Sequence, residues 1–314
     1  MKHNDAILEA FTRSSLRLNK GLMVVLGLAL LLAGTSYWAL QRVIDEQYAA
    51  VRFHFARLME NIQEQETFLR TLAQPAIQRD LISDKNTQAS LKGQRLDAYN
   101  TRFEGREFAF SVPFSSRFDE QRVSAGEQQK IFALGTHLAS YYSAFWSSSP
   151  YPSPHAFVFN RLVNYYITVP AVGYQRGGKT AYNGPSAERA DAVQQRLGQL
   201  PQPLADNQLY WEAYVTSGED PAPPRLLAYI GITLNPQVMR RHEGNKQVLV
   251  ATLLDMAQVN DVERTIESSV YDRFTLLSPS GQTLAGPSVL ASSLSEGLNF
   301  RATGLEFKIT HDTE

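Results

Sequence analysis

Cysteine is absent from the 314 residues, and neither sign of charge is in excess. Without cysteine the chain can have no disulfide, no thiolate nucleophile and no zinc ribbon or iron–sulfur cluster. The 30 Lys and Arg against 31 Asp and Glu exclude a nucleic-acid-binding protein held by bulk charge. Disorder is excluded as well, because 16 Phe, 14 Tyr and 3 Trp can form a hydrophobic core.

Recognisable catalytic and metal-binding motifs are also missing. The six His are scattered without a paired spacing, and neither H-E-x-x-H nor G-x-S-x-G occurs. We therefore expect no metal, no cofactor and no catalytic centre in these residues.

One motif does match a known pattern. Gly173 to Thr180 fits the G-x-x-x-x-G-K-[ST] phosphate loop. Such a loop must open directly into a helix whose first amides face the phosphates, and here Gly184 and Pro185 follow too soon for that helix. A glycine-rich surface turn is therefore the favoured interpretation.

A long apolar run near the N-terminus predicts a transmembrane helix over residues 21–40. No charged residue occurs between Lys20 and Arg42, and about 20 residues at 1.5 Å each span the hydrocarbon of a bilayer. Residues 1–20 hold four basic and two acidic side chains (+2), whereas residues 41–60 hold three of each. The positive-inside rule then places the tail 1–20 in the cytoplasm and exports the rest. Because the glycosylation motif N-x-[ST] does not occur, we expect a bacterial inner-membrane protein that is mainly periplasmic. A cleaved signal peptide is the main alternative.

Residues 41–75 predict a long exported helix that ends at Pro75. Its apolar residues recur at alternating spacings of four and three, a pattern typical of a coiled-coil seam or of a helix packed on a domain. Gln65 interrupts the series. We expect this helix to form a homodimer and to transmit signals, and a purely intramolecular core helix is the alternative. The seam residues are Ile44, Tyr48, Val51, Phe55, Leu58 and Ile62.

Residues 76–314 are predicted to form a periplasmic α+β domain, an antiparallel sheet flanked by helices. Residues 76–125 are polar and poorly periodic, apart from a short alternating stretch from Phe108 to Phe114. Beyond them the patterns indicate helices at 125–146, 186–200 and 258–268, strands at 155–160, 164–172, 208–216, 225–234 and 246–254, and a hairpin at 274–277 and 282–284.

Amphipathic side chains on the later strands form the candidate ligand site. Aromatic rings can wall a small polar ligand, while an arginine and a carboxylate fix its charged groups. Ordinary sheet core with an ion pair at its rim is the alternative. The candidate residues are Trp211, Tyr214, Arg225, Tyr229 and Asp255.

The order of these segments resembles bacterial sensory ectodomains of the Cache kind, and more closely the periplasmic region of Rcs-type hybrid sensor histidine kinases. The local motifs behind the resemblance are Phe157-Val-Phe-Asn160, Leu209-Tyr-Trp211 before Leu226–Ile230, and the hairpin Phe274–Leu284. The resemblance implies a PAS-like sheet and the signal-input region of a two-component receptor, relaying a small ligand or a periplasmic protein. The phosphoacceptor box and ATP lid of the kinases are not found in the sequence. The alternatives are a bitopic envelope structural or assembly factor and the input domain of a cyclic-dinucleotide enzyme.

The charge asymmetry leads to a topology prediction. Reporter domains fused after residue 60 should be active only outside the cytoplasm, because the +2 flank holds the tail inside. Paired fusions of alkaline phosphatase and of a cytoplasmic fluorescent reporter at Leu200 measure this. Activity of the cytoplasmic reporter alone at Leu200 would reverse the orientation.

Overall fold

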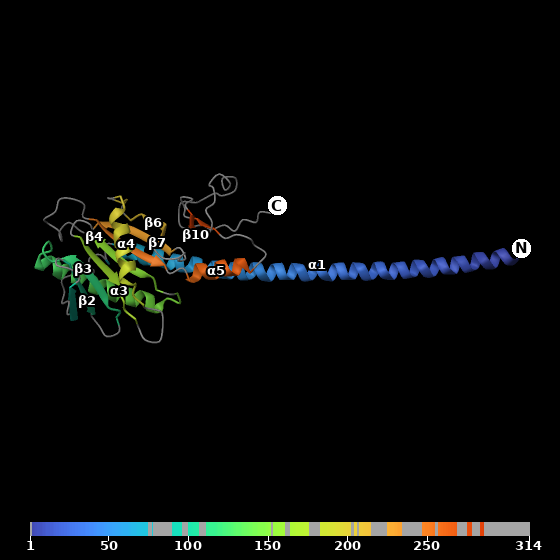
Figure 1. Cartoon of the computed structure of the whole chain (residues 1–314), viewed down its shortest axis with the longest axis horizontal. Helices are drawn as coiled ribbons and strands as arrows, with labels where there is room; N and C mark the ends of the chain where they lie inside the picture. Colours follow the sequence, from blue (N-terminus) through green and yellow to red (C-terminus); the bar gives the residue numbers. More distant parts are fainter. Residues whose placement is uncertain are drawn as a thin grey trace.

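The structure is a computed structural model that describes residues 2–74, 77, 90–95, 100–106, 111–151, 153–160, 164–175, 183–201, 204–205, 207–214, 225–233, 247–254, 257–268, 275–277 and 283–285. Its first element, α1, is a single helix from Lys2 to Leu72. In Figure 1 the amino-terminal part of α1 projects as a long rod, and its carboxyl-terminal end enters a folded domain. The predicted tail, membrane segment and exported helix are therefore parts of one helix.

The apolar run lies on the projecting part of α1. Between Leu22 and Leu40 the large apolar side chains are 56–69% exposed, so no part of the domain covers them. Within the described part of the chain, α1 is the one helix long and apolar enough to cross a membrane, which makes it a candidate span by length and composition. No Pro or Gly occurs from Thr35 to Leu72, so nothing interrupts the helix between this run and the domain.

The domain is built on an eight-stranded sheet in the order β1-β2-β3-β5-β4-β8-β7-β6. Every neighbouring pair is antiparallel, so the predicted α+β class with an antiparallel sheet is confirmed. The strands are β1 (Ser90–Arg95), β2 (Asn100–Arg106), β3 (Phe114–Asp119), β4 (His155–Asn160), β5 (Tyr165–Val169), β6 (Leu209–Tyr214), β7 (Arg225–Thr233) and β8 (Gln247–Leu254).

Three further helices and a short hairpin complete the described structure. Helix α3 (Ala125–Ser148) begins with a capping box, in which Ser124 and Glu127 each bond the other's backbone amide. Helix α4 (Ala187–Gln199) is capped by the Ser186 side chain. Helix α5 (Ala257–Glu267) packs against α1, and the hairpin of β9 (Leu276–Leu277) and β10 (Thr283–Ala285) lies beside β6 and β7.

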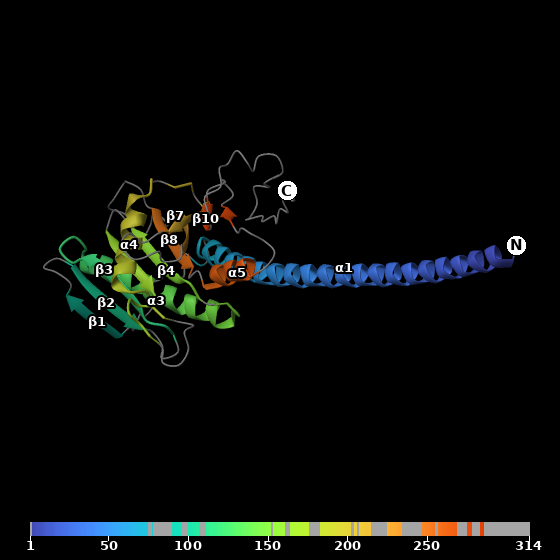
Figure 2. The ribbon, with the colours of Figure 1, turned by 45° about the vertical axis from the view of Figure 1, so that its right-hand side comes forward.

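The sheet separates two hydrophobic cores. The α1/α3 core lies between one face and the helices α1 and α3, and the α4 core lies between the other face and α4 (Figure 2). Strand β8 shows how the pleat divides its residues, because Val248 and Val250 face the α1/α3 core while Leu249 and Ala251 face the α4 core. A central strand buried on both faces is mostly apolar, and this explains the apolar run from Val248 to Ala251.

The predicted seam of α1 is used within the chain's own domain from Val51 onward. Val51, Leu58 and Ile62 are at most 4% exposed and belong to the α1/α3 core. Phe55 is partly buried against the same core. Nearer the apolar run, Ile44 is half-buried and Tyr48 is exposed. Homodimer pairing along the seam stays a prediction, and in this structure Ile44 and Tyr48 are the seam positions most open to it.

Phe68 lies at the centre of an aromatic cluster that joins α1 to α3. Its ring centroid is 5.3 Å from Phe145, 5.7 Å from Tyr141, 5.8 Å from Trp146 and 6.0 Å from Tyr142. Phe68 is fully buried, so it contributes both its burial and its ring contacts to the docking of α1.

This cluster predicts a large difference between two phenylalanines of one helix. Phe68→Ala should lower the free energy of unfolding by about 3–5 kcal/mol, because it leaves a cavity among four rings. Phe53→Ala should change it by less than about 0.5 kcal/mol, since the Phe53 ring is 63% exposed. Urea titration of the detergent-solubilised chain measures both. Equal losses in the two variants would contradict the docking of α1 described here.

Candidate functional site

The register of β6 and β7 divides the predicted ligand cluster between the two faces of the sheet. Trp211 is opposite Ala228, whereas Tyr214 is opposite Arg225 and Tyr210 is opposite Tyr229. Trp211 therefore faces the α1/α3 core, while Tyr214 and Tyr229 face the α4 core. Residues 211 and 214 are separated by an odd number, which in a strand means opposite faces.

The two remaining members of that cluster are only partly placed. Arg225 opens β7 on the same face as Tyr214, and its backbone alone is described. Asp255 lies outside the described residues. The structure thus brings Tyr214, Tyr229 and position 225 to one face and places Trp211 on the other.

Trp211 connects the sheet to α1. Its indole Nε1 donates a hydrogen bond to Oε1 of Glu66, at 3.0 Å, and the residue is buried. Glu66 lies on α1 between two buried stretches of the helix. This contact gives Trp211 a role in holding α1 on the sheet.

Gln65 makes a second polar contact between α1 and the sheet, deeper in the core. Its amide nitrogen donates to Oδ1 of Asn61 at 3.0 Å, and its Oε1 accepts from the Thr252 hydroxyl at 3.3 Å. All three residues are fully buried. The polar residue that interrupts the apolar series of α1 is therefore the one that binds β8, and its place in the seam was the sequence signal for such a partner.

Near Tyr229 an ion pair fixes α4 to β6. The Arg196 guanidinium donates from Nε and one Nη to the two carboxylate oxygens of Glu212, both at 2.8 Å. This bidentate bond raises the pKa of Arg196 above its usual value. Tyr210 and Tyr229 stack beside it with ring centroids 5.4 Å apart. Burial, reinforced by the charge of Glu212, raises the pKa of Tyr229 to about 12, so the phenol stays neutral at physiological pH.

The start of the segment that matches a phosphate loop is hydrogen-bonded to the residues just before α4. The Gly173 amide donates to the Pro185 carbonyl at 2.8 Å, and the Gly184 amide donates to the Tyr174 carbonyl at 2.7 Å. Residues 183–186 are not helical. Lys179 and Thr180 lie outside the described residues. Helix α4 begins at Ala187, and residues 176–182 lie outside the described residues, so the expected turn stays a prediction.

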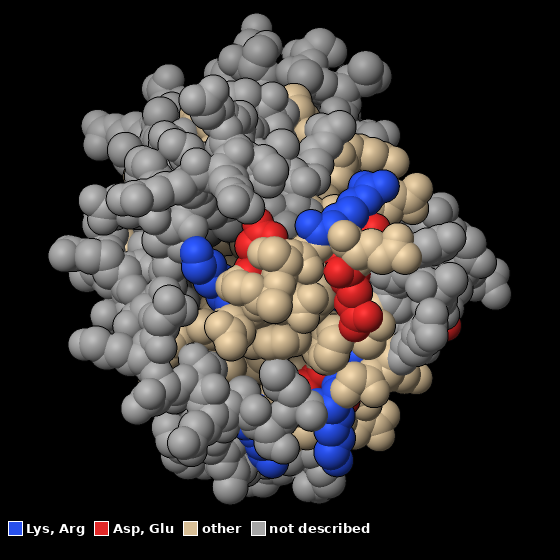
Figure 3. Space-filling model, turned by 90° about the vertical axis from the view of Figure 1, so that its left-hand side faces the viewer, with Lys and Arg blue, Asp and Glu red and all other residues tan. Residues whose placement is uncertain are grey.

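The surface at the end of the domain furthest from the apolar run carries both signs of charge. In Figure 3 Lys and Arg lie beside Asp and Glu around residues of other kinds. Among the described residues no group of three or more His, Asp or Glu is close enough to hold a metal ion.

No protein-family model matches the chain, and no curated protein or solved structure is significantly similar to it. The function must therefore be argued from the arrangement of the residues themselves.

The buried contact between α1 and β8 generates a prediction. Gln65→Leu should destabilise the domain by about 1–3 kcal/mol, because the Thr252 hydroxyl and the Asn61 amide lose a buried partner. Adding Thr252→Val should recover part of the lost stability, since it removes the Thr252 hydroxyl that Gln65→Leu leaves without a partner. Gln63→Leu, an exposed position on the same helix, is the matched control. Urea titrations of the unsubstituted chain, Gln65→Leu, Thr252→Val and the double variant give the coupling energy. Purely additive losses would show that Gln65 and Thr252 act independently.

Proposed function

We propose that this chain is the extracytoplasmic signal-input region of a bacterial membrane receptor, of the two-component sensor histidine kinase type. The observation that carries the proposal is the continuity of α1. One helix runs from an exposed apolar segment of membrane length into the core of an α+β domain. The bulk of the chain is then periplasmic, with the amino-terminal tail in the cytoplasm and a PAS-like sheet as the sensing element.

The contacts of α1 support a role in transmission. Gln65 bonds β8, Glu66 bonds β6, and Phe68 packs on α3. The sheet and helix α3 therefore both contact the same short stretch of α1. Leu58 is the first fully buried seam residue, and it lies 18 positions after Leu40, about 27 Å along the helix. An uninterrupted helix carries a displacement over that distance to the membrane.

The mechanism follows from these contacts. A ligand or partner protein that changes the packing between sheet and α1 would shift or rotate the helix, and residues 21–40 would carry the movement across the bilayer. In a homodimer the two copies of α1 would lie side by side in the same membrane. Ile44 and Tyr48, between the apolar run and the domain, are then the positions where a shift alters contacts between copies.

Cysteine crosslinking in membranes tests this proposal, and the chain has no native Cys to interfere. Disulfide yields between copies should be highest for Ile44→Cys and Tyr48→Cys. They should be minimal for Leu58→Cys and Ile62→Cys, because these positions are buried in their own domain. Uniform or absent crosslinking across 41–50 would contradict a dimer formed by α1, and crosslinks to a different protein would favour an assembly factor.

A second set of variants tests transmission itself. Trp211→Phe removes the bond to Glu66 while keeping an aromatic ring, and it should change the crosslinking yield at residues 44 and 48. Tyr210→Phe, the neighbouring residue on the opposite face of β6, should leave the yield unchanged. Yields that do not respond to Trp211→Phe would mean that α1 anchors the domain without relaying its state.

A further inference from the structure

A small cavity lies between the sheet and the amino-terminal half of α4, away from the residues discussed above. Its volume is about 60 Å³. Since one water needs about 10–15 Å³ of such space, the cavity has room for roughly four waters or for one small polar group. The lining residues are Arg102, Ser115, Ser116, Arg117, Tyr166, Thr168, Val172, Ala187, Ala190 and Asp191.

Two arginines on neighbouring strands line this cavity. Arg102 on β2 is directly opposite Arg117 on β3, so both side chains leave the sheet on the same face. Like charges in directly opposite positions repel each other, so this pair costs stability unless anionic groups compensate it. The arginine side chains are largely buried, with 18% and 29% of their surfaces exposed.

The acidic partners of the two arginines are more exposed than the arginines. Asp191 accepts a hydrogen bond from Arg117 at 2.7 Å and is 61% exposed, while Glu104 lies 3.6 Å from Nε of Arg102 and is 40% exposed. Nε of Arg102 is buried and has no hydrogen-bond partner among the described residues. Ion pairs with such exposed carboxylates are weak, so a competing anion can replace them.

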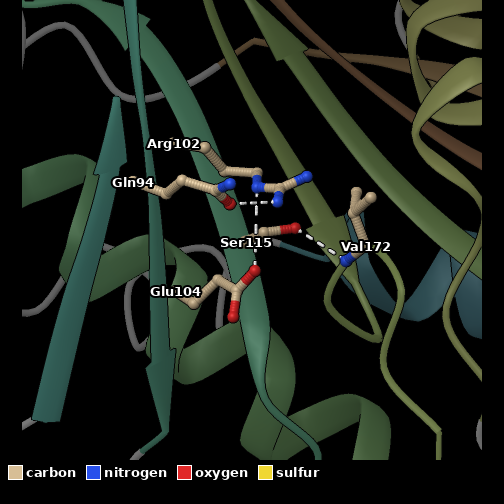
Figure 4. A network of polar contacts seen from close by, with 5 residues as sticks. All are labelled: Gln94, Arg102, Glu104, Ser115 and Val172. Atoms are coloured by element: carbon tan, nitrogen blue, oxygen red, sulfur yellow. Dashed lines mark hydrogen bonds and ion pairs between the residues drawn. The ribbon is translucent and has the colours of Figure 1, made fainter. Parts of the chain in front are cut away.

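Figure 4 shows the arrangement around Arg102. Gln94 accepts a hydrogen bond from one terminal nitrogen of the guanidinium, and Glu104 lies beside Nε. The other terminal nitrogen points away from both residues, toward the side on which Ser115 and Val172 lie. The Ser115 hydroxyl accepts from the Val172 amide at 3.0 Å, which holds the wall of the cavity in place.

Helix α4 closes the cavity with its amino-terminal end. Ala187, the first helical residue, lines the cavity, and the partial positive charge of a helix N-terminus favours anions. Tyr166 fixes the helix there, because its hydroxyl donates to the Ala190 carbonyl at 2.8 Å. Burial raises the pKa of Tyr166 well above its usual value, so the phenol adds no negative charge.

We propose that this cavity binds a single carboxylate or phosphate group of a small ligand between Arg102 and Arg117, with Asp191 turning to solvent as the anion enters. Two guanidinium groups and a helix N-terminus supply donors, while Val172 and Ala190 leave room for a short apolar stem. Anion binding is a property of the cavity and holds whether or not the chain is a receptor. In a receptor, this cavity is the input site.

Thermal unfolding of the detergent-solubilised full chain tests the site, with inorganic phosphate and acetate titrated separately against sodium chloride of equal ionic strength. At ten times its Kd, a bound anion should raise Tm by about 3–5 °C. A response to phosphate alone assigns a phosphoryl ligand, and a response to acetate alone assigns a carboxylate. Stabilisation no greater than that by chloride would overturn the proposal.

Four variants locate the effect. Arg102→Gln and Arg117→Gln should abolish the anion-specific shift, whereas Arg122→Gln, at an exposed arginine paired with Asp119, should keep it. Asp191→Asn removes the competing carboxylate and should lower the half-saturating anion concentration about two- to five-fold. Because that variant keeps both arginines, it stays informative if the arginine variants fold poorly. An equal shift in all variants, or an unchanged affinity in Asp191→Asn, would place the anion elsewhere.

Discussion

The burial of the carboxyl-terminal turns of α1 is the constraint on which the rest of the structure depends. This helix packs on β7 and β8 beside α3, with its residues from Leu58 to Leu72 in the core, and its Phe68 ring contacts four aromatic residues of α3. Without it, one face of β7 and β8 would expose a large apolar surface to water. The same helix carries the exposed apolar run, so one element must meet the requirements of a protein core at one end and those of lipid at the other.

The two faces of the sheet carry different kinds of contacts. The α1/α3 side holds the helix that leads away from the domain, and there the buried Gln65 bonds both Asn61 and Thr252. The α4 side holds the charged groups, with the Arg196–Glu212 pair near β6 and the Arg102–Arg117 pair near the opposite edge. A ligand bound on the α4 side could affect the packing of α1 only by displacing the strands between them. The central strand β8 is buried along its whole length.

Much of this fold could be predicted from the sequence, and the gaps have physical causes. The strands from β4 to β8 and the helices α3, α4 and α5 lie within a few residues of their predicted positions, because they carry long apolar patterns and capping residues. Strands β1 and β2 were not predicted, since SLKGQR and NTRFEGR are polar sequences at the edge of the sheet. The alternation from Phe108 to Phe114 predicts a strand; residues 107–110 lie outside the described residues, residues 111–113 are not in a strand, and β3 begins at Phe114. For the candidate site, Trp211 and Tyr214 were grouped by proximity in sequence, and the pleat separates them. The arginine pair depends on the register of two strands, one of which lacked any pattern.

The buried amides of α1 also limit how the helix can move along the sheet. Asn61 lies one helical turn before Gln65, on the same side of the helix. A slide of one full turn, about 5.4 Å, would bring Asn61 to the place that Gln65 now holds, so the Thr252 hydroxyl would again face an amide. A fractional slide would leave that hydroxyl against an apolar side chain. The buried bond between Gln65 and Thr252 therefore favours the present position of α1 on β8 over a small displacement along the sheet.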